Sequence, residues 1–433
     1  MKPIRSALTI TVIFLGLMLS KTASAFEIVI DEGVENALPI AIVPFGWNQS
    51  AAMPPTDVAE VIRQDLARSG HFNALPPADM PAKPTSFDAI NFADWRRLGM
   101  EHVVVGELKQ RDDGGFEVSF RLVDVYRGSQ VAGYSIRTRK EQLRYTAHQV
   151  ADIIYEELTG NRGAFATRIA YITVNKKNDK KVHKLEIADA DGHGAQVLLT
   201  SPEPLMSPRW SPDGRRLAYV SFEGRNSAVY IQNVYSGQRK EVASHSGINS
   251  APAWSPDGNK LAMTLSKDGS PDIYVMDIDS DRLQRVTNSS SIDTEAAWSA
   301  DGDMLYFTSD RGGSPQIYKV AASGGTPKRV TFDGGYNARP ALSPDGEKLA
   351  MVRGGDGYRI AVQDLDSGRS QVLTDGSLDE SPSFAPNSGM IIYATTVGES
   401  GALAAVSVDG QVKQKLEATR GDVREPDWGP FQD

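Results

Sequence analysis

One acidic run in the 433-residue chain has the spacing of a metal-binding loop. Carboxylates alternate with other residues from Asp277 to Asp281, as they do at the start of a calcium loop. However, Arg282 stands where such a loop needs glycine, and Asn288 stands where it needs glutamate. A hairpin turn is therefore the better interpretation of this run, and the same holds for residues 189–192. No metal site is predicted.

Residue types that carry out catalysis are either missing or not arranged for it. The chain has no cysteine, which excludes thiolate nucleophiles, disulfides and cysteine-bound metals. It also lacks the nucleophile elbow Gly-x-Ser-x-Gly, the phosphate-binding Gly-Lys-Ser/Thr and the zinc motif His-Glu-x-x-His. No two of its six histidines, at positions 71, 102, 148, 183, 193 and 245, are spaced as a metal pair on one element. The sequence therefore predicts a protein that is not an enzyme.

Charge and length narrow the class of protein further. Fifty-five acidic residues against 46 basic ones give a net charge of −9, and no basic block stands out. Nucleic acid is therefore not an expected partner. With 40% hydrophobic residues, the chain can bury a sizeable core, and its length is typical of two or three domains.

The first 25 residues have the composition of a secretory signal peptide. Lys2 and Arg5 precede an apolar run over residues 7–19, which is short for a membrane span. Ala23 and Ala25 supply the small residues that a signal peptidase requires, so cleavage is expected after Ala25. This complete cleavage pattern disfavours the alternative, an uncleaved membrane anchor. The rest of the chain is expected to be exported, soluble and not inserted in a membrane.

A signature of the form Trp-Ser-Pro-Asp-Gly recurs along the second half of the chain. Each copy reads as four short strands separated by turn residues. Six copies at a near-constant period predict a six-bladed β-propeller, in which the bulky signature residues pack between blades. The copies are centred on Trp210, Trp254, Trp298, Leu342, Phe384 and Trp428, with spacings of 44, 44, 44, 42 and 44 residues.

The two ends of the repeat region complement each other. Residues 169–200 have the strands of a blade but lack the signature strand that opens the other copies. Residues 425–430 are a signature strand with nothing after it. The C-terminal strand is therefore predicted to pair with the opening segment and close the ring, which removes the exposed edges of an open sheet.

Residues 26–165 lack the signature and read as an α/β domain of ordinary size. A helix is expected from the N-cap Thr56 to Gly70, and a longer helix over residues 142–158. Strands are expected over residues 101–109, 116–126 and 130–138. The complete expectation is a signal peptide at residues 1–25, an N-terminal α/β domain at residues 26–165 and an all-β six-bladed propeller at residues 166–433.

The two faces of such a propeller should differ in what they can recognise. The Ser-Pro-Asp-Gly turns are nearly identical between copies, so they serve the scaffold. The loops on the opposite face differ from blade to blade and can therefore carry specific recognition. These loops span residues 176–181, 201–207, 244–250, 288–295, 332–339, 375–381 and 419–424.

Together with the repeats, three other segments resemble the TolB family of periplasmic Tol-Pal proteins. They are residues 27–34 (Glu-Ile-Val-Ile-Asp-Glu-Gly-Val), 39–45 (Pro-Ile-Ala-Ile-Val-Pro-Phe) and 204–208 (Pro-Leu-Met-Ser-Pro). The resemblance covers essentially the whole chain after the expected cleavage site. It implies a non-enzymatic hub of protein–protein interactions in the periplasm, which supports outer-membrane integrity and invagination during cell division.

The resemblance also implies two partners and a site for each. The peptidoglycan-associated lipoprotein Pal would bind the loop face of the propeller, where Ile248 stands in place of the family's usual histidine. The C-terminal domain of TolA would bind the N-terminal segment, which could dock as an edge strand on its own protein or leave to pair with a partner. The implied Pal site comprises Met206, Asn249, Ala251, Thr294, Glu295, Arg339 and Glu380. The implied TolA site comprises Phe26, Glu27, Ile28, Val29, Ile30, Asp31, Glu32, Gly33 and Val34.

Two other classes of protein stay open at the level of sequence. One is a propeller hydrolase or lyase with an acid–base pair in its channel, and the other is a propeller that binds a small ligand there. No cofactor is predicted. A cation in the channel, held by inward-facing carboxylates such as Glu295, is possible but is not part of the prediction. The free protein is expected to be monomeric.

Overall fold

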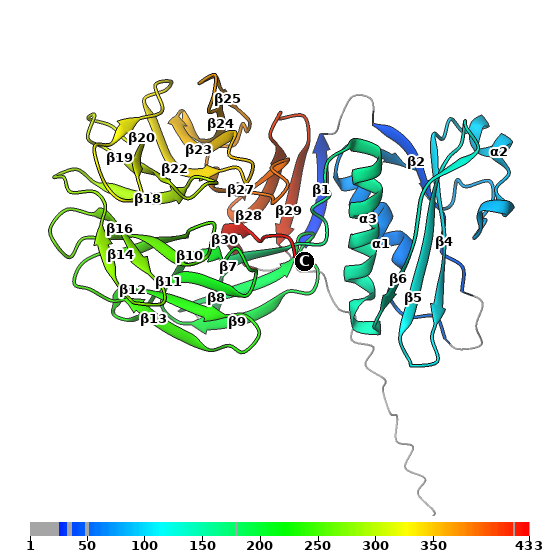
Figure 1. Cartoon of the computed structure of the whole chain (residues 1–433), viewed down its shortest axis with the longest axis horizontal. Coiled ribbons are helices and arrows are strands. Elements are labelled where there is room, and N and C mark those ends of the chain that lie inside the picture. The colour runs from blue at the N-terminus through cyan, green and yellow to red at the C-terminus, as the bar shows by residue number, and fades with distance from the viewer. Residues whose placement is uncertain (1–25, 33–36, 48–51, 178–179, 419–420, 433) are drawn as a thin grey trace, which may run out of the picture.

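The computed structural model describes residues 26–32, 37–47, 52–177, 180–418 and 421–432. Two domains lie side by side, with the propeller on the left of Figure 1 and the α/β domain on the right. The expected signal peptide, including Ala23 and Ala25, lies outside the described residues, as do Gly33 and Val34. Among the residues that the structure describes, no helix is long and apolar enough to cross a membrane.

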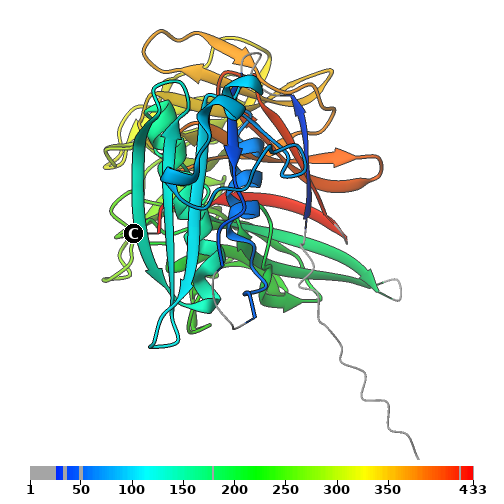
Figure 2. The same ribbon diagram turned by 90° about the vertical axis from the view of Figure 1, so that its right-hand side faces the viewer.

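The N-terminal domain is a five-stranded sheet with helices on both faces, and it stands in front of the propeller in Figure 2. Its strands are β2 (Leu38–Ile42), β3 (Phe72–Ala74), β4 (His102–Gln110), β5 (Phe116–Asp124) and β6 (Ser129–Thr138). Its helices are α1 (Val58–Arg68), η1 (Phe87–Ala89), α2 (Phe92–Arg97), η2 (Lys140–Gln142) and α3 (Leu143–Thr159). The strand order is β3-β2-β4-β5-β6, with β2 parallel to both neighbours and β4, β5 and β6 antiparallel.

Apolar faces of the helices explain how this sheet is covered. Ile62 of α1 and Ile154 of α3 are fully buried in one core cluster with the sheet, as the helical spacing of their apolar neighbours predicts. Trp95 of α2 is buried in a separate cluster on the other face. The sheet is thus held between two hydrophobic layers, which fixes the positions of α1 and α3 beside the propeller.

The two long helices begin and end close to the expected residues. Asp57, and not Thr56, caps α1, because its Oδ1 accepts a hydrogen bond from the backbone N–H of Glu60 at 3.1 Å. Helix α3 ends at Gly160, whose φ of +76° is a left-handed conformation that glycine adopts without strain. The expected domain boundary, between residues 165 and 166, falls in the connection between α3 and the first propeller strand.

The propeller has six blades, each an antiparallel sheet of four strands, as the repeats predict. Blade one consists of β30 (Asp422–Trp428), β7 (Arg168–Lys177), β8 (Lys180–Asp189) and β9 (Gln196–Ser201). Blade two consists of β10 (Leu205–Trp210), β11 (Arg216–Gly224), β12 (Asn226–Asn233) and β13 (Arg239–Ala243). Blade three consists of β14 (Asn249–Trp254), β15 (Lys260–Leu265), β16 (Asp272–Asp277) and β17 (Leu283–Arg285). Blade four consists of β18 (Asp293–Trp298), β19 (Met304–Ser309), β20 (Gln316–Ala321) and β21 (Lys328–Arg329). Blade five consists of β22 (Tyr336–Leu342), β23 (Lys348–Gly355), β24 (Gly357–Asp364) and β25 (Ser370–Val372). Blade six consists of β26 (Glu380–Phe384), β27 (Met390–Val397), β28 (Ser400–Ser407) and β29 (Lys413–Ala418).

The ring closes through the C-terminal strand, as predicted. Strand β30 pairs antiparallel with β7, so the first and last parts of the repeat region share blade one. A fifth strand, β1 (Phe26–Glu32), pairs with the outer edge of β29 in blade six. In Figure 1 this dark-blue strand lies between the two domains.

The signature residues hold the blades together in two ways. Trp298 is buried between Ile273 of blade three and Leu305 of blade four, which confirms its expected packing role. Its indole Nε1 also donates to the carbonyl oxygen of Ala253 in blade three at 3.0 Å. In the turns after four of the six signature strands, the serine hydroxyl bonds the aspartate side chain two residues later, as Ser255 does with Asp257.

Candidate binding face of the propeller

The first strand of every blade contains a β-bulge at the same place. Register shifts interrupt its pairing with the second strand in all six blades. At each bulge one residue has a left-handed backbone with φ between 47° and 57°, which is uncommon for residues other than glycine. Because a bulge redirects a side chain, we treat the six positions as one structural feature and name them the ring residues. They are Ser207, Ala251, Glu295, Arg339, Ser381 and Glu425.

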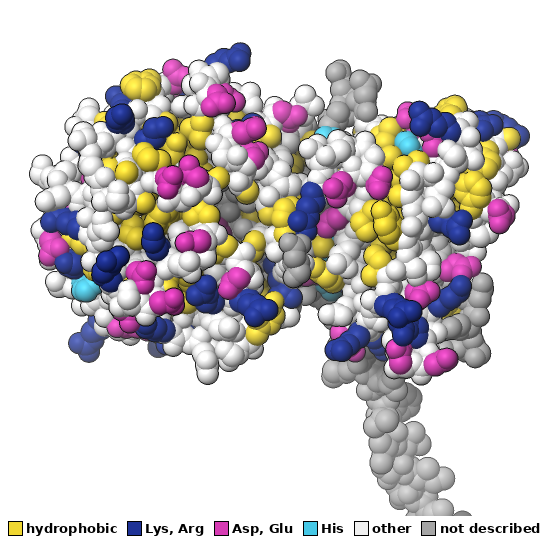
Figure 3. All heavy atoms as spheres, in the orientation of Figure 1, with side chains coloured by type: hydrophobic (Ala, Val, Ile, Leu, Met, Phe, Trp, Pro, Cys, Tyr) yellow, Lys and Arg dark blue, Asp and Glu magenta, His cyan; other side chains and the backbone are white. Residues whose placement is uncertain are grey.

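The ring residues line a cavity of about 710 Å³ that runs through the middle of the propeller. Other first-strand residues, such as Met206, Thr294 and Asp427, line the same cavity. In Figure 3 the propeller is hollowed near its centre, with hydrophobic atoms around the depression. A concave site of this size can receive a small ligand or a side chain that projects from a partner.

Negative charges outnumber positive charges around the ring residue Arg339. Nε of Arg339 donates to Oε1 of Glu295 at 3.0 Å, and the hydroxyl of Thr308 donates to Oε2 of the same glutamate at 3.0 Å. Burial opposes the charge on Arg339, but the nearby carboxylates of Glu295, Glu425 and Glu380 outweigh it and raise the pKa of the guanidinium. One cation therefore faces three carboxylates, which leaves this part of the channel with an excess of negative charge.

Five of the seven residues of the implied Pal site come together around the channel. Met206, Ala251, Thr294, Glu295 and Arg339 all line the cavity, although they come from four different blades. Glu380 is half-buried and directly precedes a ring residue. These six residues lie on the same face of the propeller, because each is in or beside a loop that precedes the first strand of a blade.

Asn249 has a different position. Its side chain has 0% exposure, and it is bonded within its own loop and to the neighbouring blade. Its Oδ1 accepts from the backbone N–H of His245 at 2.9 Å, and its Nδ2 donates to the carbonyl oxygen of Ser227 at 3.0 Å. Asn249 therefore shapes the loop and offers no surface to a partner.

Apart from Ile248, the sequence reasoning missed a set of large apolar residues on the same loops. Ile248, Ile292 and Leu378 are 44%, 50% and 41% exposed, which is unusual for large aliphatic side chains gathered on one face. Each stands three residues before a ring residue, and Tyr336 occupies the equivalent place in blade five. This constant offset from the signature is a signal that could have found them. We call these four residues the apolar rim.

The N-terminal domain leaves the loop face uncovered. Helix α3 and the segment that follows it contact turns on the opposite side, between first and second or third and fourth strands. Nδ2 of Asn387, in such a turn of blade six, donates to the carbonyl oxygen of Arg162 at 2.8 Å. Arg144 of α3 pairs with Asp191 in the turn between β8 and β9. Within the described residues, the ring and the apolar rim are therefore on the free side of the disc.

The N-terminal segment is docked as an edge strand. Six residue pairs join β1 to β29, from Phe26 opposite Ala418 to Glu32 opposite Lys413. Of the two arrangements that the sequence leaves open, the structure has the docked one. Residues Phe26 to Glu32 of the implied TolA site thus form one continuous strand, whereas Gly33 and Val34 lie outside the described residues.

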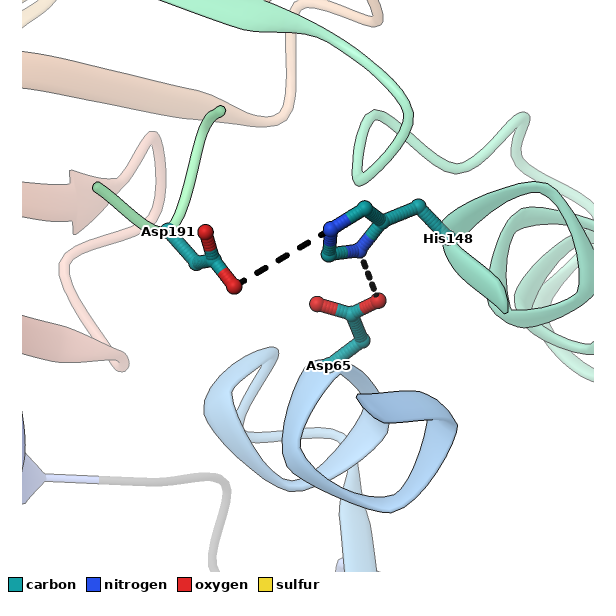
Figure 4. A group of neighbouring side chains, drawn as sticks. All are labelled: Asp65, His148 and Asp191. Atoms are coloured by element: carbon teal, nitrogen blue, oxygen red, sulfur yellow. Dashed lines mark hydrogen bonds and ion pairs between the residues drawn. The ribbon is translucent and has the colours of Figure 1, made fainter. Parts of the chain in front are cut away.

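A second group of charged side chains joins the two domains (Figure 4). Nδ1 of His148 on α3 lies 2.5 Å from Oδ2 of Asp65 on α1, and its Nε2 lies 4.0 Å from Oδ2 of Asp191. These three side chains are close enough to hold a metal ion. However, Arg68 pairs with Asp65 and Arg144 pairs with Asp191, so both carboxylates already have cationic partners. We interpret the group as an ionic contact between the domains.

The protonation states in this interdomain cluster balance its charges. Burial opposes the charge on His148, but Asp65 and Asp191 outweigh it and raise the pKa of the imidazole. Burial also opposes the charge on Asp191, yet the cations around it lower its pKa to about 2. An imidazolium and two guanidiniums then face the carboxylates of Asp65, Asp189 and Asp191. The members come from three segments that are far apart in the chain, on α1, on α3 and in the turn after β8, so no spacing in the sequence could have revealed the cluster.

Family models match both domains. Residues 26–131 match the TolB amino-terminal domain, and residues 155–432 match the TolB beta propeller domain. Together these matches cover all six blades and the α/β domain apart from residues 132–154.

Similar proteins match over nearly the whole chain. A Tol-Pal system protein TolB of Thioalkalivibrio sulfidiphilus is 62% identical over 412 residues, which are 95% of each chain. One of Xanthomonas oryzae is 50% identical over 434 residues, covering 100% of this chain and 99% of the relative. The crystal structure of TolB from Acinetobacter baumannii is 40% identical and superposes with a TM-score of 0.86, over 94% of this chain and 100% of that one.

Proposed function

Because the chain belongs to the TolB family of Tol-Pal system proteins, we propose that it is a periplasmic interaction hub of this cell-envelope system. Its proposed role is to support outer-membrane integrity and the invagination of the envelope during cell division. It acts by binding other proteins, not by catalysis, and it needs no cofactor. The signal-peptide composition of the first 25 residues supports export to the periplasm.

The first proposed partner is Pal, bound on the loop face. The observation that carries this proposal is the combination of a hollow channel, a ring with excess negative charge and an exposed apolar rim on the face that the N-terminal domain leaves free. Exposed apolar patches with polar surroundings are typical of protein-binding surfaces. Thr294 stands in this surface, half-buried and within 3.2 Å of the hydroxyl of Thr264.

The second proposed partner is the C-terminal domain of TolA, bound by residues 26–34. Docking of β1 on β29 supports this proposal, because a segment that pairs through its backbone at a sheet edge can pair in the same way with another protein. Residues 26–32 have no proline and only one β-bulge in their pairing with β29, which suits them to strand exchange.

The state of Glu295 supports a non-enzymatic role. A channel hydrolase or lyase would need a carboxylate free to act as an acid or a base. Both oxygens of Glu295 are instead engaged, by Arg339 and by Thr308, so this side chain serves to hold neighbouring blades together.

Calorimetric titration tests the two partner sites separately. The protein comprising residues 26–433 would be titrated with a soluble Pal domain and, in parallel, with the TolA C-terminal domain. Three variants are compared: Thr294→Arg on the loop face, Thr326→Arg on an exposed turn of the opposite face, and a chain that lacks residues 26–34. We expect Thr294→Arg to weaken Pal binding by a factor of about 100, which is ~2.7 kcal/mol, because it brings an unpaired charge into the contact.

The pattern of losses decides between the sites. Loss of Pal binding in Thr294→Arg alone, with loss of TolA binding only in the shortened chain, supports both assignments. Equal Pal affinity in Thr294→Arg and Thr326→Arg would move the Pal site off the loop face. Absence of Pal binding by the unsubstituted protein would overturn the proposed function. A propeller that binds a small ligand, or a propeller hydrolase or lyase, would then be the better interpretation.

A further inference from the structure

The last strand of the N-terminal sheet has a free edge. In the described part of the chain, β6 pairs with β5 on one side and with no strand on the other. In Figure 2 no further strand lies beside the outermost, teal strand of this sheet. A free edge presents a row of unpaired backbone N–H and C=O groups, which is a template for another extended chain.

Several of the devices that usually protect such an edge are missing here, although Arg137 supplies one charge. Natural proteins protect free edges with charged side chains, above all lysine, or with proline, very short strands or strong bulges. Strand β6 is ten residues long, contains neither proline nor lysine, and has its register shift only near the turn that precedes it. Residues 132–138 therefore pair regularly with β5 and leave a straight outer edge.

The two sides of this edge have different chemistry. On the side that faces the helices, Tyr134 is 50% exposed and contacts Phe120, with ring centroids 5.9 Å apart and ring planes tilted by 34°. Ile136 on the same side is half-buried. On the other side Arg121 lies opposite Gly133, and a Cβ on that glycine would be only 3.4 Å from the arginine Cγ. The Gln130 side chain lies closest over this glycine, with its Nε2 2.6 Å from the Cβ position, and the aliphatic part of Arg121 lies beside it.

Arg137 places a second cation on the same side, four residues along the strand from Gly133. Both arginines are exposed. Among the described residues, Arg121 has no ion pair, and Arg137 has only a long contact of 4.0 Å with Glu117. The edge therefore has apolar groups on one side and two weakly paired cations on the other.

We propose that the β6 edge is a docking site for an extended segment of a partner protein in which apolar and acidic residues alternate. Such a segment would continue the sheet as a sixth strand through backbone hydrogen bonds. Because side chains alternate between the faces of a strand, its apolar residues would cover Tyr134 and Ile136 while its carboxylates meet Arg121 and Arg137. This site is on the N-terminal domain and is separate from the loop face and from β1.

The test uses a synthetic probe and matched charge reversals. A fluorescein-labelled peptide of about eight residues, in which valine and glutamate alternate, would be titrated into the protein comprising residues 26–433 and followed by anisotropy. A second peptide has lysine in place of glutamate. The variant R121E/R137E removes the proposed cations, and R215E/R282E changes the net charge equally on exposed turns of the propeller. Amide hydrogen exchange would report which strand is protected.

We expect saturable binding of the glutamate peptide, slower exchange over Ser129–Thr138, and at least about tenfold weaker binding by R121E/R137E but not by R215E/R282E. The reversed variant should instead prefer the lysine peptide, which shows that it is folded. The proposal is overturned if the glutamate peptide does not bind, if both double variants lose binding equally, or if protection appears on another strand. Dimerisation of the protein through β6 would also overturn it, because the occupant would then be a second copy.

Discussion

Glu295 and Arg339 occupy the same position in neighbouring blades, 44 residues apart, and their side chains join at 3.0 Å across the channel wall. Both have the left-handed backbone of the ring residues. One bulge in each blade therefore aims two opposite charges at each other. This ion pair holds blades four and five together at the rim of the proposed Pal site.

Removing the cation of this pair should destabilise the propeller. In Arg339→Met the carboxylates of Glu295, Glu380 and Glu425 face one another without a cation, and we expect the free energy of unfolding to fall by about 1–3 kcal/mol. Urea unfolding followed by tryptophan fluorescence measures this change. Arg339→Met with Glu295→Gln should recover part of the loss, and Arg215→Met should stay within about 0.5 kcal/mol of the unsubstituted protein. Strict additivity of the two substitutions would contradict the pairing.

Two signature tryptophans, one with and one without an indole hydrogen bond, allow the contribution of that bond to stability to be measured. Nε1 of Trp298 donates to the carbonyl of Ala253, whereas the buried Nε1 of Trp210 has no hydrogen-bond partner among the residues that the structure describes. Both side chains are 7% exposed, so replacement by phenylalanine removes the same volume from similar surroundings. We expect Trp298→Phe to cost about 1 kcal/mol more than Trp210→Phe in chemical unfolding. Equal costs would show that the bond contributes nothing measurable.

Close contact between the domains should make Gly70 sensitive to any side chain. Gly70 has φ +73°, and a Cβ there would lie 2.6 Å from Cγ2 of Val412 in the propeller. Gly160 has nearly the same backbone, with φ +76°, but nothing within 4 Å of its Cβ position. We expect Gly160→Ala to cost about 1 kcal/mol from backbone strain alone, and Gly70→Ala to cost about 1–3 kcal/mol more.

Thermal unfolding of both glycine variants measures the difference. In Gly70→Ala combined with Val412→Ala, removal of the valine methyl groups should recover part of the loss. A Gly70→Ala protein as stable as Gly160→Ala would mean that the domains can separate there without cost.

The interdomain cluster should make stability depend on pH above about 6.5, the ordinary pKa of histidine. The raised pKa of His148 means that its stabilising contribution is complete below the unfolded value of 6.5 and is lost as the pH rises through the folded pKa. Burial lowers the pKa values of His71, His102, His183 and His193, so these groups titrate below this window. We therefore expect the free energy of unfolding to decrease as the pH rises from about 6.5.

Two substitutions identify the group responsible for this slope. His148→Gln should flatten the dependence above pH 6.5, and Asp191→Asn should reduce it by removing one of the carboxylates that hold the proton. His245→Gln, outside the cluster, serves as the control. An unchanged slope in His148→Gln would assign the pH dependence to another group.

The repeat pattern made the propeller predictable, because each blade is a local unit whose strands and turns follow one another directly in the chain. The period around Trp210 and Trp254 indicates the number of blades, and the unpaired signature at Trp428 indicates how the ring closes. Helix boundaries were off by one or two residues, as at Asp57, because the capping hydrogen bond depends on local geometry that composition does not specify.

The candidate site was only partly predictable. The ring residues are serine, alanine, glutamate and arginine, so no residue type marks them; the bulge constrains the backbone and leaves the side chain free to vary. Asn249 shows the opposite error, since a polar residue beside the site is fully buried and bonds its own loop. Burial is a property of the assembled blades and cannot be read from a single loop.

The sequence by itself determined the fold class, the six blades, the closing strand and the family, because these depend on periodic patterns and contiguous motifs. Only the tertiary structure decided which side chains meet: Glu295 with Arg339 across two blades, and Asp65 with His148 and Asp191 across two domains. The physical reason is that the energies of ion pairs and buried charges depend on distance and solvation in space. Residues far apart in the chain acquire these partners only when the sheets and helices have packed.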